Sequence, residues 1–363
     1  MTASDSAVAC TGYPHTLVRV PGKVILSGEH AVVYGTPALA CAIQKYAFAK
    51  ITHARVNGVQ LKVPEFGIDQ HFTYAQLSQL ANQTQGRHKK FLADKGLLSN
   101  VVVNPIDFFA AALGASGLLN ILSKPQGLVI ELTMELVAGG GMGSSAALVV
   151  AMLAGAFKHL EQPLTAFELV LKTTQSEHWQ HGHSSGLDPY VCVMGGLQHY
   201  QKGVGERQLL KHLPQCFLVT TGKPQSSTGD CVALVKQQNF APSLWQQFAA
   251  VEESLRHTLA GYTPANTAVA LHPQAGIINA IKANHQLLDH IGVVPNTVAK
   301  FIAHIEVQRG AAKICGAGSV IGDNAGLVLV VGIALRQLEK LCTSHGFGVQ
   351  TMLPDLQGVF YYD

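Results

Sequence analysis

The residues that most constrain this fold form a glycine-rich stretch that runs directly into an apolar segment. The stretch is Val137-Ala-Gly-Gly-Gly-Met-Gly-Ser-Ser-Ala-Ala147, and residues 148–157 continue it without a charge. Glycines let other atoms approach the backbone closely and permit the positive φ angles of a tight loop. Alanine favours a helix, so bare N–H groups and the positive end of the helix dipole would gather behind the loop. The pattern predicts an anion-binding loop at a helix N-terminus.

The side chains and backbone of this loop supply the first candidate ligand contacts. The candidate phosphate-binding residues are Gly139, Gly140, Gly141, Gly143, Ser144 and Ser145. No lysine follows the glycines, which excludes the Gly-x4-Gly-Lys-Ser/Thr loop of P-loop NTPases. Composition alone also allows a tight turn before a packed helix, and other segments must decide between the two interpretations.

Composition bounds the class of protein. The chain has 363 residues, 48% hydrophobic and 13% charged, which predicts a folded chain of two domains or one large domain. Its net charge of +3 and scattered basic residues predict neither nucleic acid nor a membrane as partner. The longest apolar runs, residues 146–157 and 327–335, are too short to cross a bilayer. Seven scattered cysteines are typical of reduced thiols, so we expect a cytoplasmic protein.

Hydrophobic periodicity predicts strands and helices that are mixed along the chain, the pattern of an α+β fold. Strands are predicted at residues 17–20, 24–26, 39–43, 129–137, 216–220, 327–333 and 357–362. Helices are predicted at residues 145–159, 164–180, 229–260 and 273–292. The polar stretch at residues 202–208 is the predicted boundary between an N-terminal domain, residues 1–205, and a C-terminal domain, residues 206–363.

Two further motifs place the glycine loop in a family. Near the N-terminus the chain reads Pro21-Gly-Lys-Val-Ile-Leu-Ser-Gly-Glu-His-Ala-Val-Val-Tyr-Gly35, and near the C-terminus Lys313-Ile-Cys-Gly-Ala-Gly-Ser-Val-Ile-Gly-Asp-Asn-Ala-Gly326. With the glycine loop between them, they resemble the three signature motifs of the GHMP kinases, and the first is similar to the form found in mevalonate kinases. The resemblance implies two domains, one like ribosomal protein S5 domain 2 and one ferredoxin-like. It also implies phosphoryl transfer from ATP, with Mg²⁺, to mevalonate.

The segment Glu177-His-Trp-Gln-His-Gly-His-Ser-Ser-Gly-Leu-Asp188 resembles the family pattern Glu…His-Gly-x-Pro-Ser-Gly-x-Asp. The resemblance implies that Asp188 contacts the acceptor hydroxyl and that Glu177 binds magnesium together with Ser145. The alternatives are a turn aspartate and a solvated glutamate on a helix face. Because Pro189 follows Asp188, we expect an extended backbone there. The three histidines of the segment match no zinc motif, so we assign them to packing and hydrogen bonding.

Further site residues follow from the resemblance. It implies that Lys23 lies beside Asp188 and keeps it ionised, although a surface lysine is the alternative. It implies that Glu29 orients Ser145 and the metal, and that His30 lines the mevalonate pocket. It also assigns substrate contacts to Thr228, Gly316 and Ala317. The loop at residues 221–228 also fits a substrate- or phosphate-side loop of these kinases, with Lys223, Ser227 and Thr228 as weaker candidates.

The third motif departs from the mevalonate kinase pattern, Lys-x-Thr-Gly-Ala-Gly-Gly-Gly-Gly. Only Gly316-Ala-Gly is retained, and Ser319 and Val320 bring side chains into the loop. Its ending, Gly322-Asp-Asn-Ala-Gly326, resembles that of phosphomevalonate kinases and diphosphomevalonate decarboxylases. The alternatives to a mevalonate 5-kinase are therefore a sister enzyme acting on a phosphorylated mevalonate, and a non-catalytic protein that binds a small molecule. The sequence leaves open whether the protein forms a homodimer.

Overall fold

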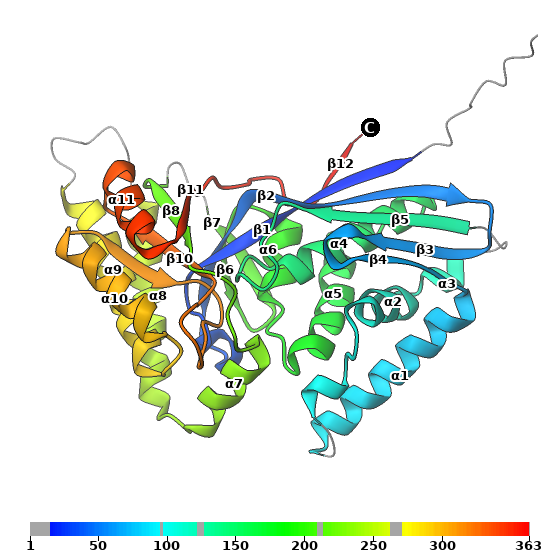
Figure 1. The fold of residues 1–363 in the computed structure, drawn as a ribbon, viewed down its shortest axis with the longest axis horizontal. Helices are drawn as coiled ribbons and strands as arrows, with labels where there is room; N and C mark the ends of the chain where they lie inside the picture. Colours follow the sequence, from blue (N-terminus) through cyan, green and yellow to red (C-terminus); the bar gives the residue numbers. More distant parts are fainter. Residues whose placement is uncertain (1–14, 95–96, 122–126, 209–212, 262–270, 363) are drawn as a thin grey trace, which may run out of the picture.

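Two separate β-sheets organise the chain (Figure 1). The computed structural model describes residues 15–94, 97–121, 127–208, 213–261 and 271–362. The first sheet has the order β12-β1-β2-β5-β3-β4, and β6 pairs with both β2 and β7. Its strands are β1 (Thr16–Ser27), β2 (Ala38–Ala54), β3 (Gly58–Val63), β4 (Ile68–Phe72), β5 (Gly127–Met134), β6 (Leu197–Gln201), β7 (Val204–Gln208) and β12 (Phe360–Tyr362). All pairings except that of β3 with β5 are antiparallel.

The second sheet is smaller, and its pairings are all antiparallel in the order β11-β8-β10-β9. Its strands are β8 (Cys216–Thr220), β9 (Ala311–Ile314), β10 (Leu327–Val331) and β11 (Gly348–Thr351). The helices that accompany it are α7 (Thr228–Gln237), α8 (Pro242–Ala260), α9 (Leu271–His290), α10 (Asn296–Val307) and α11 (Leu335–His345). β9 and β10 are completely apolar apart from Lys313, and all their residues are buried.

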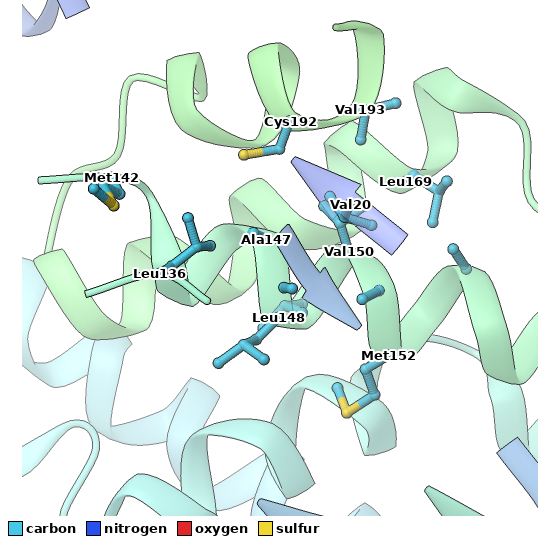
Figure 2. Close-up of a cluster of buried hydrophobic side chains, with 14 of the residues drawn as sticks. Val20, Leu136, Met142, Ala147, Leu148, Val150, Met152, Leu169, Cys192 and Val193 are labelled. Atoms are coloured by element: carbon cyan, nitrogen blue, oxygen red, sulfur yellow. The ribbon is translucent and has the colours of Figure 1, made fainter. Parts of the chain in front are cut away.

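The helices of the first sheet lie below it in Figure 1. They are α1 (Tyr74–Leu92), α2 (Pro105–Ala115), α3 (Leu118–Ile121), α4 (Ser144–His159), α5 (Ala166–His181) and α6 (Leu187–Met194), with short 3-10 turns at Ala31–Tyr34, Pro64–Phe66 and Leu98–Asn100. α4 is buried from Ala146 to Phe157. A helix that is apolar all round belongs in a core, and Figure 2 shows its Leu148 and Met152 among buried side chains of the surrounding elements.

Most of the predicted elements are present, with several differences in extent, of which the largest is that the strand predicted at 39–43 continues to Ala54 as β2. The predicted strands at 17–20 and 24–26 are one strand, β1, whose pairing with β2 shifts register between Pro21 and Gly22. Proline has no N–H for the ladder, so a bulge there keeps the strand continuous. The predicted strand at 129–137 ends at Met134. The predicted helix at 229–260 is two helices, because Pro242 begins α8 at a position that needs no N–H donor.

The division into two domains stays a prediction, and the sheets suggest how to refine it. β7 pairs with β6 and runs to Gln208, past the predicted boundary at 205. β12, near the C-terminus, pairs with β1. We propose that both strands belong to the N-terminal unit. Among the described residues, no helix is long and apolar enough to span a membrane.

Candidate active site

Lys23 and Asp188 meet at the end of the glycine loop. Lys23 Nζ lies 3.1 Å from Asp188 Oδ1, and the lysine side chain is almost fully buried. Gly22 permits this position, because a Cβ there would collide with Leu136 and with the carbonyl of Met142. The backbone N–H of Lys23 donates to Met142 O at 2.9 Å, so β1 is fixed against the loop. The structure therefore brings together the two residues predicted to be catalytic.

The backbone of Asp188 differs from the predicted extended conformation. Asp188 lies in the first turn of α6, after Gly186, which has a left-handed φ of 81°. Pro189 is accommodated because N–H groups in the first turn of a helix have no partner within the helix. The carboxylate consequently lies at the positive end of a helix and beside an ammonium group. Both are favourable surroundings for a negatively charged side chain.

The glycine loop ends where α4 begins, as predicted. Gly139, Gly141 and Gly143 all have positive φ, and Gly143 is the N-cap of α4. A Cβ at Gly143 would lie 3.1 Å from Lys23 Cγ and 3.3 Å from Asp188 Oδ2. The carbonyl of Gly140 is bonded to the start of β10, just after the third motif, since it accepts a hydrogen bond from the N–H of Leu327 at 3.1 Å. The roles predicted for these residues in phosphate binding remain predictions.

Ser145 and Glu177 form a second polar pair beside the loop. Ser145 Oγ donates to Glu177 Oε1 at 2.9 Å, and Glu177 is 2% exposed. His181 Nε2 lies 3.4 Å from the other carboxylate oxygen, Oε2. Burial lowers the pKa of His181, but the hydrogen bond and charge of Glu177, with the charge of Asp188, outweigh it and raise the pKa above its usual value. The sequence predicts packing or hydrogen bonding for His181, and its i,i+4 spacing from Glu177 indicates this partner.

The altered third motif packs against the glycine loop. A Cβ on Gly141 would collide with Cys315 O, and one on Gly326 would lie 2.9 Å from Gly140 O. Ser319 does not enter the site, because it is 2% exposed and its hydroxyl bonds to Ser226 Oγ at 3.1 Å. Val320 packs on the apolar core of the second sheet. The side chains of Ser319 and Val320 therefore do not interfere with the packing of the third motif against the glycine loop.

Three cavities adjoin this arrangement, and we name each by one lining residue. The Asp188 cavity has a volume of about 130 Å³, the Ser226 cavity about 330 Å³ and the Phe108 cavity about 650 Å³. Gly141, His181, Thr228 and Ala317 line both the Asp188 and the Ser226 cavities. Gly139, Gln180, Lys223 and Ser227 line both the Ser226 and the Phe108 cavities. Shared walls place the Ser226 cavity between the other two.

The predicted site residues distribute over these cavities. The Asp188 cavity is lined by all five predicted substrate-binding residues and by both predicted catalytic residues: Lys23, Glu29, His30, Asp188, Thr228, Gly316 and Ala317. Glu177 also lines it, whereas Ser144 and Ser145 line the Phe108 cavity. Gly140 and Gly143 line none of the three, within the part of the chain that the structure describes. In that same part, no three His, Cys, Asp or Glu side chains are grouped to hold a metal.

His30 forms part of the wall between β1 and the third motif. Its Nε2 donates to Ala317 O at 3.0 Å. Burial lowers the pKa of His30, and the hydrogen bond to Ala317 offsets this only in part. The imidazole is therefore neutral at pH 7, and its buried Nδ1 has no protein partner among the described residues.

Comparison with known proteins places this site in a family. Residues 100–196, which contain the glycine loop, Glu177 and Asp188, match the model of the GHMP kinases N terminal domain. The chain is similar to the mevalonate kinase of Thermococcus sibiricus, with 28% identity over 83% of this chain and 86% of that one. The chain belongs to the GHMP kinase family.

Structural comparison extends the match to both sheets of this GHMP kinase. The Methanococcus jannaschii mevalonate kinase superimposes with a TM-score of 0.72 at 17% identity, over 95% of this chain and 99% of the other. The L. major mevalonate kinase in complex with R-mevalonate gives a TM-score of 0.62 at 21% identity, over 93% of this chain and 95% of the other. These matches confirm the predicted GHMP kinase fold of mixed helices and strands.

Proposed function

We propose that this GHMP kinase transfers the γ-phosphoryl group of ATP to the 5-hydroxyl of mevalonate, which gives 5-phosphomevalonate. The observation that carries the proposal is the Asp188 cavity. In this cavity the Asp188 carboxylate, which pairs with Lys23 at 3.1 Å, faces an apolar wall made by Ile25, Val32 and Leu187. Mevalonate is a small branched hydroxy acid, so an apolar wall suits its carbon skeleton and the carboxylate suits its terminal hydroxyl.

The proton of the hydroxyl defines the role of Asp188. Phosphoryl transfer has a loose transition state, so positioning and neutralisation of charge supply most of the rate enhancement. Asp188 accepts the proton as the bond to phosphorus forms. Lys23, whose Nζ lies 3.1 Å from Asp188 Oδ1, faces the charge that develops on the acceptor oxygen.

The nucleotide fits the other two cavities. The Phe108 cavity has apolar walls, including Phe108, Phe109 and Trp179, that suit a purine base. The Ser226 cavity connects it to Asp188 and is lined by Gly139 and Gly141, whose N–H groups suit phosphate oxygens. ATP therefore runs from the Phe108 cavity, along the glycine loop, to the acceptor.

The chemistry of Ser145 and Glu177 fits a magnesium ion. A hydroxyl and a carboxylate oxygen 2.9 Å apart, beside the glycine loop, are the hard oxygen donors that Mg²⁺ accepts along with water and phosphate oxygens. When bound, magnesium would neutralise charge on the transferred phosphoryl group. His181 holds the second carboxylate oxygen of Glu177 and so fixes its orientation.

Replacing Glu177 by Gln tests this assignment. Because a charged ligand is lost while the shape is kept, we expect the magnesium concentration for half-maximal activity to rise about tenfold or more. Saturating magnesium should restore part of kcat. Glu168→Gln is the matched control, since Glu168 lies on the same helix and caps its start through Thr165. An unchanged magnesium requirement in Glu177→Gln would assign this carboxylate to structure alone.

Lys223 supplies a second test, on the nucleotide side. It lines both the Ser226 and the Phe108 cavities, and it is their one lysine or arginine among the described residues. Lys223→Met should raise the KM for ATP about tenfold, because a charge-assisted contact to phosphate is lost. The defect should shrink in high salt, which screens such contacts. The exposed Lys340 of α11 provides the control variant, Lys340→Met, and equal effects of the two would exclude a phosphate contact by Lys223.

A phosphorylated mevalonate is the second candidate acceptor, and the same cavity disfavours it. Among the described residues that line the Asp188 cavity, Lys23 is the one lysine or arginine, and Asp188 already pairs with it. A second phosphate would need further cationic partners. Steady-state assays with mevalonate, phosphomevalonate, galactose and homoserine decide the acceptor. We expect kcat/KM to be highest for mevalonate, and a preference for phosphomevalonate would overturn the proposal. A homodimer and a cytoplasmic location remain predictions.

A further inference from the structure

A buried polar cluster, of which one member lines the Asp188 cavity, takes no part in the proposed mechanism. Glu29 and Lys313 form an ion pair whose two side chains are completely inaccessible to solvent. Lys313 Nζ also donates to Ile25 O at 3.0 Å and to Ile314 O at 2.9 Å. An ammonium group has three N–H donors, so all the donors of Lys313 have partners.

The second oxygen of Glu29 is bonded as well. Glu29 Oε2 accepts from Asn284 Nδ2 at 3.1 Å, and Asn284 Oδ1 accepts from Ser27 Oγ at 3.1 Å. Asn284 belongs to α9 and is completely buried. We call Ser27, Glu29, Asn284 and Lys313 the Glu29 cluster. It joins the end of β1, a strand of the first sheet, to the helix α9 and to β9, a strand of the second sheet.

The residues that follow the cluster along the chain are walls of the active site. His30 follows Glu29 and donates to Ala317 O at 3.0 Å. Cys315 and Gly316 follow shortly after Lys313, and Cys315 O is so close to Gly141 that no Cβ would fit between them. The position of the Glu29 cluster therefore fixes His30 and Ala317 relative to each other and to the glycine loop.

We propose that Glu29 is a positioning residue, which acts through Lys313 and Asn284 to hold the His30–Ala317 wall of the acceptor site. Both of its carboxylate oxygens are committed to buried donors, and Ser145 is paired with Glu177 instead. The inference rests on the acceptor site proposed above. It differs from the role implied by the family resemblance, in which Glu29 orients Ser145 and the metal.

A double-mutant cycle separates the two roles. Glu29→Gln leaves the buried Lys313 charge without its partner, and Lys313→Met leaves that of Glu29. Each single variant should lower Tm by about 10 °C, since a broken buried pair is costly. It should also raise the acceptor KM about tenfold while the directly measured Kd for ATP changes by less than about threefold. The double variant removes both charges, so it should recover at least half of the loss in Tm and in KM.

An exposed ion pair supplies the matched control. Lys62 and Asp69 lie 3.8 Å apart with side chains 40% and 61% exposed, so Lys62→Met and Asp69→Asn should shift Tm by no more than about 3 °C. If a single variant of the cluster fails to fold, Ser27→Ala removes only the hydrogen bond to Asn284 and should raise the acceptor KM about threefold.

Two outcomes overturn the inference. The first is a double variant that is as impaired in Tm and in acceptor KM as Glu29→Gln, when excess magnesium relieves the impairment of both variants. That pattern belongs to a residue that acts on the metal. The other is an unchanged Tm in both single variants. Tm and the Kd for ATP are measured without an acceptor. These two measurements therefore still test the role of Glu29 if mevalonate proves not to be the substrate.

Discussion

Asp188→Asn should lower kcat by about 10²–10⁴-fold, the range typical of a lost general base. An amide keeps the shape of the side chain but cannot accept the hydroxyl proton. The Kd for ATP should stay nearly unchanged, because Asp188 lines the Asp188 cavity and neither of the two cavities assigned to the nucleotide. Single-turnover kinetics and calorimetric titration with ATP, on the same preparation, measure the two quantities separately.

Lys23→Met should reduce kcat as well, since it removes the cation 3.1 Å from the Asp188 carboxylate. The two residues act as a unit, so the double variant should be less impaired than the product of the two single effects. Strictly multiplicative effects would show that the ion pair does not couple them in catalysis. Full activity of Asp188→Asn would remove the central residue of the mechanism and favour a binding protein that has kept the fold.

Gly143→Val should be the next most damaging change. Gly143 is the left-handed N-cap of α4, with φ of 69°, where a β-branched residue is strained. Its Cβ would also press on Lys23 and on Asp188, whose nearest atoms are 3.1 Å and 3.3 Å away. We expect the Kd for ATP to rise at least about tenfold, because phosphate loses its approach to the backbone. kcat should also fall, because the catalytic pair is displaced.

The strain and the contact can be separated with a second glycine. Gly346, the C-cap of α11, has the same φ of 69°, and a Cβ there would meet nothing within 4 Å. Gly346→Val should cost stability of a similar size and leave both Kd and kcat near the values of the unmodified protein. Circular dichroism confirms that each variant is folded. If both variants change Kd equally, the effect of Gly143→Val is general destabilisation and the loop assignment is wrong.

The local parts of the site could be predicted from the sequence. The glycine loop and the helix behind it were placed within one residue, because glycine and alanine have strong and opposite backbone preferences. The break between Gln237 and Pro242 was missed, because apolar periodicity continues through it. The prediction of an extended backbone at Asp188 was also wrong. The rule for residues before proline is a bias, and the first turn of a helix tolerates proline.

The long-range parts could not be predicted from periodicity or motifs. Glu29 and Asn284 are far apart in the chain, and nothing in their local sequence indicates a hydrogen bond. The same holds for Ser319, a substituted motif residue whose side chain was expected to lie in the loop. Its hydroxyl bonds to Ser226 of the loop before α7, so the departure from the family pattern is absorbed by packing. Such pairs arise from the tertiary arrangement of the two sheets, which each local pattern leaves unspecified.

The most direct test of the proposed function is ³¹P NMR of a reaction that contains the purified protein, ATP, magnesium and R-mevalonate. The account predicts that a phosphomonoester resonance, coupled to the C5 methylene protons of mevalonate, grows as the γ-phosphate signal of ATP declines. Asp188→Asn should show neither change over the same interval. ATP that stays intact with mevalonate but is consumed with phosphomevalonate would contradict the account.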